Sequence, residues 1–189
     1  MISEKMARVV LVGMCCLLVQ CKVEPTFTST GELEPFYGTF VGSTATVSKG
    51  EKFERDLTVI IMPWENKGFT VNWTTVIYRA NGERKKTEPS INFYRSSRTG
   101  IFASAMKSNV FGHTVPYDPI GEGANPYVWA GLEDKTLTIS ALYIIDGGGY
   151  EMHVYKRTLE AWGLSLDFER ISNGEKVTQV TARLDRVIP

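Results

Sequence analysis

Two groups of side chains in this sequence have the chemistry to hold a polar or anionic head group. In the first, Tyr155 and Arg157 stand two residues apart in an alternating segment, so they share one face of a strand. A guanidinium can pair with a carboxylate through two parallel hydrogen bonds, and a phenol adds another donor. The pair is therefore a candidate ligand-binding site. Because Met152 and Val154 lie on the opposite face, however, the alternation favours a pair that points to solvent.

The second group lies between Met106 and Pro126, where glycines and prolines interrupt aromatic residues. It brings together three candidate ligand-binding residues, His113, Tyr117 and Asp118. A connection of this length within a compact domain usually has a function. We expect it to cover one end of the fold and to supply specificity; a loop that only plugs that end is the alternative.

The sequence gives little support for a metal, cofactor, catalytic or nucleic-acid-binding site. His113 and His153 are the two histidines, without metal-ligand spacing, so we expect no metal site and no cofactor. No Gly-x-Ser-x-Gly, phosphate loop or dinucleotide motif is present, and no catalytic residue is predicted. The charges balance at 21 basic and 21 acidic residues without a basic patch, which argues against nucleic-acid binding.

The first residues read as an export signal. Lys5 and Arg8 precede a short apolar stretch, so residues 1–21 are expected to be a signal peptide. The stretch ends at Cys21 in a pattern that resembles a bacterial lipoprotein signal, which implies a lipid anchor on that cysteine. Gln20 departs from the small residue usual there, and ordinary cleavage nearby is the alternative. Residues 22–35 would form an arm or tether, and the protein would be exported to the periplasm or cell envelope.

The rest of the chain, residues 36–189, is expected to be one domain. Turn signals such as Asn81-Gly82 and Asn173-Gly174 recur along it, and type I′ hairpin turns need positive φ at both central residues. Between the turns lie ten strand candidates: 37–47, 53–62, 69–79, 85–94, 101–103, 127–132, 136–145, 150–158, 164–170 and 177–187. Consecutive hairpins form a meander that removes its edges by closing. The sequence therefore predicts an all-β fold, an antiparallel up-and-down β-barrel of about eight to ten strands.

The first strand carries a family resemblance. Gly38-Thr39-Phe40-Val41-Gly42 resembles the Gly-x-Trp signature that opens lipocalins and other calycin barrels. In that family the aromatic residue closes one barrel end under an arginine from a late strand. The resemblance implies that Phe40 has this structural role, with Arg183 or Arg186 as the arginine.

The resemblance also implies a function. Most calycins carry small hydrophobic molecules, and the branch of fatty-acid carriers grips a carboxylate with an Arg-x-Tyr pair, which Tyr155 and Arg157 present in reverse order. We thus expect an exported protein that binds a small hydrophobic or amphipathic ligand in its cavity. One alternative is a structural envelope protein with a side-chain-filled barrel and a protein partner, and a second is an enzyme on a calycin-like barrel.

Overall fold

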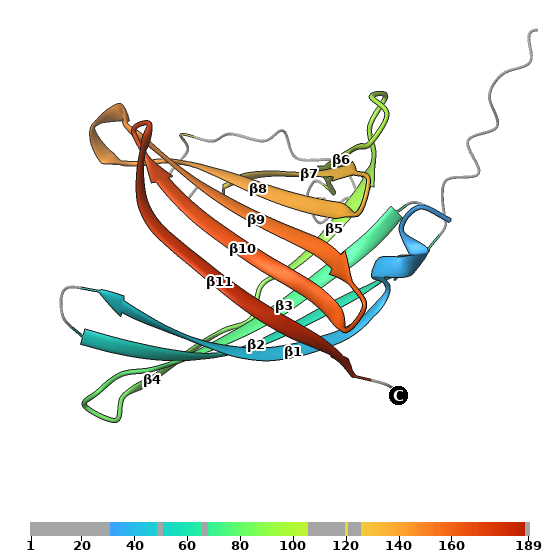
Figure 1. Cartoon of the computed structure of the whole chain (residues 1–189). Coiled ribbons are helices and arrows are strands. Elements are labelled where there is room, and N and C mark those ends of the chain that lie inside the picture. Colours follow the sequence, from blue (N-terminus) through green and yellow to red (C-terminus); the bar gives the residue numbers. More distant parts are fainter. Residues whose placement is uncertain (1–30, 49–50, 66–67, 106–119, 121–125, 188–189) are drawn as a thin grey trace, which may run out of the picture.

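The computed structural model describes residues 31–48, 51–65, 68–105, 120 and 126–187. Most of these residues lie in the strands of a single antiparallel sheet (Figure 1). The strands are β1 (Gly38–Ser48), β2 (Glu51–Trp64), β3 (Gly68–Tyr78), β4 (Arg84–Thr87), β5 (Ser90–Arg95), β6 (Ile101–Ser104), β7 (Tyr127–Glu133), β8 (Thr136–Ile144), β9 (Tyr150–Glu160), β10 (Gly163–Ser172) and β11 (Glu175–Val187).

The sheet closes on itself. Apart from β4 and β5, which do not pair with each other, each strand pairs with its neighbours in the chain, and β1 pairs with both β2 and the last strand, β11. β4 pairs with β3 alone and lies outside the closed ring, so ten of the eleven strands form the barrel. The predicted all-β, antiparallel barrel is therefore confirmed.

The β10–β11 hairpin shows how the sequence sets these connections. Asn173 has a φ of 48° and Gly174 a φ of 88°, as the type I′ turn expected from Asn-Gly requires. In the β7–β8 hairpin, Asp134 likewise takes a positive φ of 49°. Asn and Asp adopt this conformation at low cost, which is why such residues mark the turns.

One predicted strand is divided in the structure. The segment 85–94 was expected to be continuous, but it forms β4 and β5 with Glu88 and Pro89 between them. Proline has no backbone N–H to donate to a ladder. Its carbonyl still accepts a hydrogen bond from the backbone N–H of Trp73, so the two pieces follow β3 one after the other.

One end of the barrel is filled by side chains. The 3-10 helix η1 (Glu34–Phe36) lies across this end, and Leu33 and Phe36 are buried there. Within the expected arm, Leu33 thus packs into this end of the barrel. Buried aromatic rings fill this end: Phe36, Phe40, Phe69, Phe93 and Phe102. Neither η1 nor η2 (Asp146–Gly148), the helices of the described ranges, has the length and apolarity to cross a membrane.

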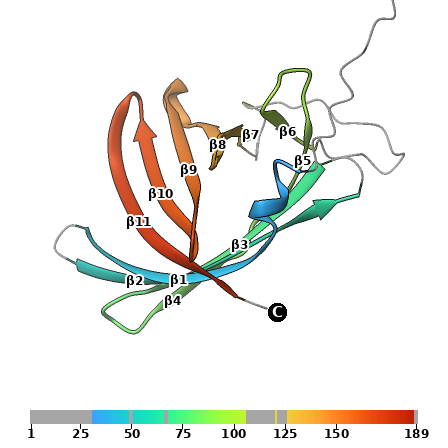
Figure 2. The same ribbon diagram turned by 45° about the vertical axis from the view of Figure 1, so that its right-hand side comes forward.

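The opposite end is the mouth, where the β1–β2 hairpin diverges from β11 (Figures 1 and 2). β1 and β11 pair only where residues 39–41 of β1 meet residues 185–187 of β11. A Cβ at Gly42 would lie 2.0 Å from the carbonyl oxygen of Arg183, so the close crossing of the two strands requires glycine. Beyond this crossing, Thr44 donates a side-chain hydrogen bond to the carbonyl of Thr181 across the widening seam, at 2.9 Å.

Candidate ligand-binding site

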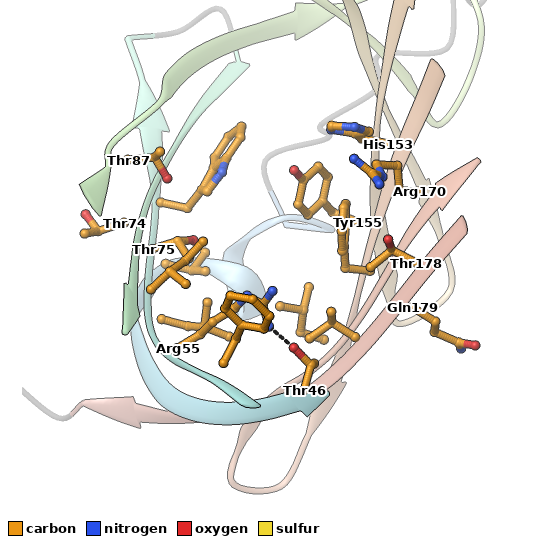
Figure 3. Close-up of a pocket in the computed structure, with 18 of the residues that line it drawn as sticks. Thr46, Arg55, Thr74, Thr75, Thr87, His153, Tyr155, Arg170, Thr178 and Gln179 are labelled. Carbon is orange, nitrogen blue, oxygen red and sulfur yellow. Dashed lines mark hydrogen bonds between the residues drawn. The ribbon is translucent and has the colours of Figure 1, made fainter. Parts of the chain in front are cut away.

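A cavity of about 750 Å³ lies between the filled end and the mouth. Its lining comes mainly from β2 and β3 on one side and from β9, β10 and β11 on the other (Figure 3). The apolar lining residues include Leu57, Val59, Trp73, Leu166, Phe168 and Val180. Binding sites for small molecules have volumes in this range, with mostly apolar walls and a few polar groups.

Tyr155 and Arg157 face this cavity, so the expectation that they point to solvent is wrong. Arg157 is only 1% exposed and pairs across the strands with Leu137 and Leu166, which are both buried. Met152, on the opposite face, instead lies on the outside of the barrel. There its cross-strand neighbours on β8 and β10 are apolar as well, so these side chains shield one another without a core.

Arg157 is a buried cation without a described counter-ion. Its guanidinium carbon lies 5.7 Å from the ring centroid of Trp73 and 5.4 Å from that of Tyr155. Its Nε and Nη1 atoms are buried and have no hydrogen-bond partner among the described residues. Burial lowers the pKa of Arg157 to about 10, and Tyr155 offsets only part of that shift.

Tyr155 belongs to an aromatic wall beside this guanidinium. Its ring centroid lies 4.7 Å from that of Phe168 and 5.8 Å from that of Trp73. Burial raises the pKa of Tyr155 to about 12, with a smaller contribution from Tyr143 in the same direction. The phenol therefore stays neutral at physiological pH and keeps an O–H that it can donate.

The charged lining residues are all cations. They are Arg55, Arg79, Lys85, Arg157 and Arg170, and no Asp or Glu lines the cavity within the described ranges. The whole chain, in contrast, carries 21 basic and 21 acidic residues. The imbalance is local, and a cleft lined by one sign of charge concentrates counter-ions of the other sign.

His153 lies nearer the mouth, next to a carboxylate just outside the lining. Its Nε2 lies 2.5 Å from Glu151 Oε1, and its ring centroid is 4.7 Å from that of Tyr143. Arg170 Nη1 is 3.9 Å from the same Glu151 oxygen. His153 and Arg170 thus share one carboxylate partner, and the described residues contain no group of three or more His, Cys, Asp or Glu side chains that could hold a metal ion.

At the filled end, Arg186 is the late-strand arginine that covers Phe40. Its guanidinium carbon lies 4.5 Å from the Phe40 ring centroid, and Phe40 is fully buried. Arg186 also donates hydrogen bonds to the carbonyls of Tyr37, at 2.6 Å, and Pro35, at 2.5 Å. These hydrogen bonds from Arg186 therefore hold η1 in place across the barrel end. Arg183 lies instead over Trp162 on the surface, with a ring distance of 4.8 Å.

Four of the expected site residues lie outside the described residues. They are His113, Tyr117 and Asp118 of the 106–126 connection, and Cys21, the candidate for lipidation. The described part of the chain therefore brings together Tyr155 and Arg157 in the cavity, and Phe40 and Arg186 at the filled end.

Sequence reasoning missed Arg55 on β2, which Figure 3 shows in the cavity with Thr46. Arg55 donates a side-chain hydrogen bond to the Thr46 hydroxyl. The signal was present in the alternation: Arg55 has the same parity as the apolar residues Leu57 and Val59 and so must share their face.

No protein-family model matches the chain, and no curated protein matches its sequence significantly. The site must therefore be interpreted from its own geometry.

Proposed function

We propose that this barrel binds a small amphipathic molecule whose anionic head group pairs with Arg157. The observation that carries the proposal is the burial of this arginine in a cavity where the described residues leave two of its nitrogens without a hydrogen-bond partner and supply no carboxylate to the lining. A carboxylate or phosphate could accept hydrogen bonds from the guanidinium and from the neutral phenol of Tyr155. The resemblance to fatty-acid-binding calycins agrees with this chemistry.

The energetics favour a bound anion. Moving a charged side chain out of water costs several kcal/mol even after the protein relaxes. The cation–π contacts with Trp73 and Tyr155 offset some of this cost, at 5.7 and 5.4 Å, near the outer limit of about 6 Å for such contacts. They leave Nε and Nη1 without a hydrogen-bond partner among the described residues, and a charge-assisted hydrogen bond to a ligand would supply one.

The walls suit an apolar body attached to that head group. Trp73, Tyr155 and Phe168 present ring faces, and Leu57 and Leu166 present aliphatic surface. Burying apolar surface contributes about 25 cal/mol per Å². A cavity of about 750 Å³ also supports a binding protein over a structural protein with a barrel filled by side chains.

Titration calorimetry with dodecanoate and its neutral counterpart dodecanol tests the proposal. We expect dodecanoate to bind about 10–100-fold more tightly, since a hydrogen bond to a charged group contributes about 1.5–3 kcal/mol. Arg157→Gln should remove this preference, while Arg183→Gln, a change at an exposed arginine, should keep it. Equal affinities for the acid and the alcohol in the unmodified protein would contradict the proposal.

We further propose that the protein acts after export and without its leader, either with Cys21 retained and lipidated as the first mature residue or with residues 1–21 removed by ordinary cleavage. The support is the basic start and apolar stretch of the leader. The intact mass of protein isolated from its native envelope should lack the leader, and a mass excess equal to acyl chains would assign the lipid anchor. A mass that includes Met1 would contradict export with cleavage.

A further inference from the structure

The cavity has cations at both of its ends. The cation at the mouth indicates which chemical group lies at the second end of the ligand. Arg157 lies deep in the barrel, at the level of the pair formed by Val59 and Trp73. Arg55 stands four residues further along β2, toward the mouth. At a rise of about 3.3 Å per residue, the level of Arg157 and the position of Arg55 are separated by about 13 Å along β2.

The other arginines near the mouth already have carboxylate partners. Arg79 pairs with Glu83 at 2.8 Å, and Arg170 lies 3.9 Å from Glu151. Both arginines also have side chains that are more than 40% exposed, so water solvates much of their charge. Neither arginine requires a ligand to balance it.

Arg55 differs from them. Its polar partner within the described ranges is the neutral hydroxyl of Thr46, and its guanidinium carbon lies 6.0 Å from the Phe53 ring centroid. The side chain is half-buried, and this burial lowers the pKa of Arg55. No described carboxylate contacts Arg55. Arg55 is therefore a second cation without a described counter-ion, at the mouth, as Arg157 is in the interior.

Between these two arginines the lining includes the apolar and aromatic residues Leu57, Trp73 and Phe168, together with the hydroxyl-bearing Thr75. A ligand with a single anionic group on Arg157 would place its apolar end among the cations of the mouth. We infer that the ligand is a dianion, with a second anionic group that pairs with Arg55 and an apolar chain between the two charges. This inference rests on the proposed function, because it takes Arg157 as the site of the first group.

A comparison of dodecanedioate with dodecanoate tests the inference, because the extended diacid spans a distance similar to the separation of the two arginines. We expect the diacid to bind about 10-fold or more tightly than the monoacid, as one further charge-assisted contact would give. In a series of octanedioate, dodecanedioate and hexadecanedioate, affinity should be highest for dodecanedioate.

Two variants separate the arginines. Arg55→Gln should abolish the preference for the diacid and leave dodecanoate affinity within about 2-fold, whereas Arg157→Gln should weaken both ligands. Arg183→Gln is the control, because this exposed arginine lies outside the cavity lining and pairs with Asp185, and it should preserve the preference. Near-UV circular dichroism of each variant verifies that the barrel is folded.

The outcomes are distinct. If dodecanoate binds as tightly as the diacid and still depends on Arg157, the dianion inference is overturned and the proposed function stands. If neither ligand depends on Arg157, the proposed function fails, and this inference fails with it.

Discussion

Replacing Arg157 by methionine is expected to raise the free energy of unfolding of the unliganded protein by about 1–4 kcal/mol. Most changes at a buried residue destabilise a fold, but here the lost group is a buried charge with two nitrogens that have no hydrogen-bond partner among the described residues. Methionine keeps an unbranched apolar stem, fills irregular space and contacts aromatic rings favourably. The substitution removes the desolvation cost together with the guanidinium contacts to Trp73 and Tyr155, which the thioether replaces in part.

Urea denaturation of ligand-free protein measures this effect, and the same variant should lose its preference for anionic ligands. Arg183→Met is the control: this arginine has a side chain 62% exposed, and changes at such positions usually alter stability by less than about 0.5 kcal/mol. Destabilisation by Arg157→Met would show that groups of the protein itself stabilise the Arg157 guanidinium. The guanidinium would then not require an anionic ligand, which would contradict this account.

Replacing Phe40 by alanine should destabilise the barrel by roughly 3–5 kcal/mol, the range for large-to-small changes at buried aromatic residues. Phe40 is fully buried and supports Arg186, which holds η1 through the carbonyls of Pro35 and Tyr37. The variant loses the ring, leaves a cavity and removes the surface on which the guanidinium rests.

Val41→Ala serves as the comparison for this change, because Val41 is the next residue on β1 and is 38% exposed. The denaturation midpoint should fall strongly for Phe40→Ala and only slightly for Val41→Ala. Similar small shifts in both variants would mean that the ring of Phe40 contributes little to closing this end.

Much of the fold could be predicted from local signals. Asn173 and Gly174 identify a type I′ hairpin because few other residue pairs accept positive φ at both positions. β-branched and aromatic residues between such turns then favour strands, and a long meander favours closure. The break at Pro89 could also have been read from the sequence, since proline cannot donate to a ladder.

The site was harder to predict, because alternation identifies two faces of a strand without saying which lies inside. On β9 the apolar Met152 and Val154 suggested the inner face, yet the structure places Tyr155 and Arg157 there. A barrel with a cavity can hold polar residues inside, and apolar residues outside can shield one another. Only the register of β9 against β8 and β10 decides between the two arrangements.

A crystal structure of the complex with dodecanoate tests the central claim most directly. We predict that the carboxylate lies within about 3 Å of the Arg157 guanidinium, the distance of a charge-assisted hydrogen bond. The chain should extend past Trp73, Tyr155 and Phe168 toward Arg55. A carboxylate bound at the mouth with its chain directed inward, or dodecanoate found only on the outer surface, would contradict the account.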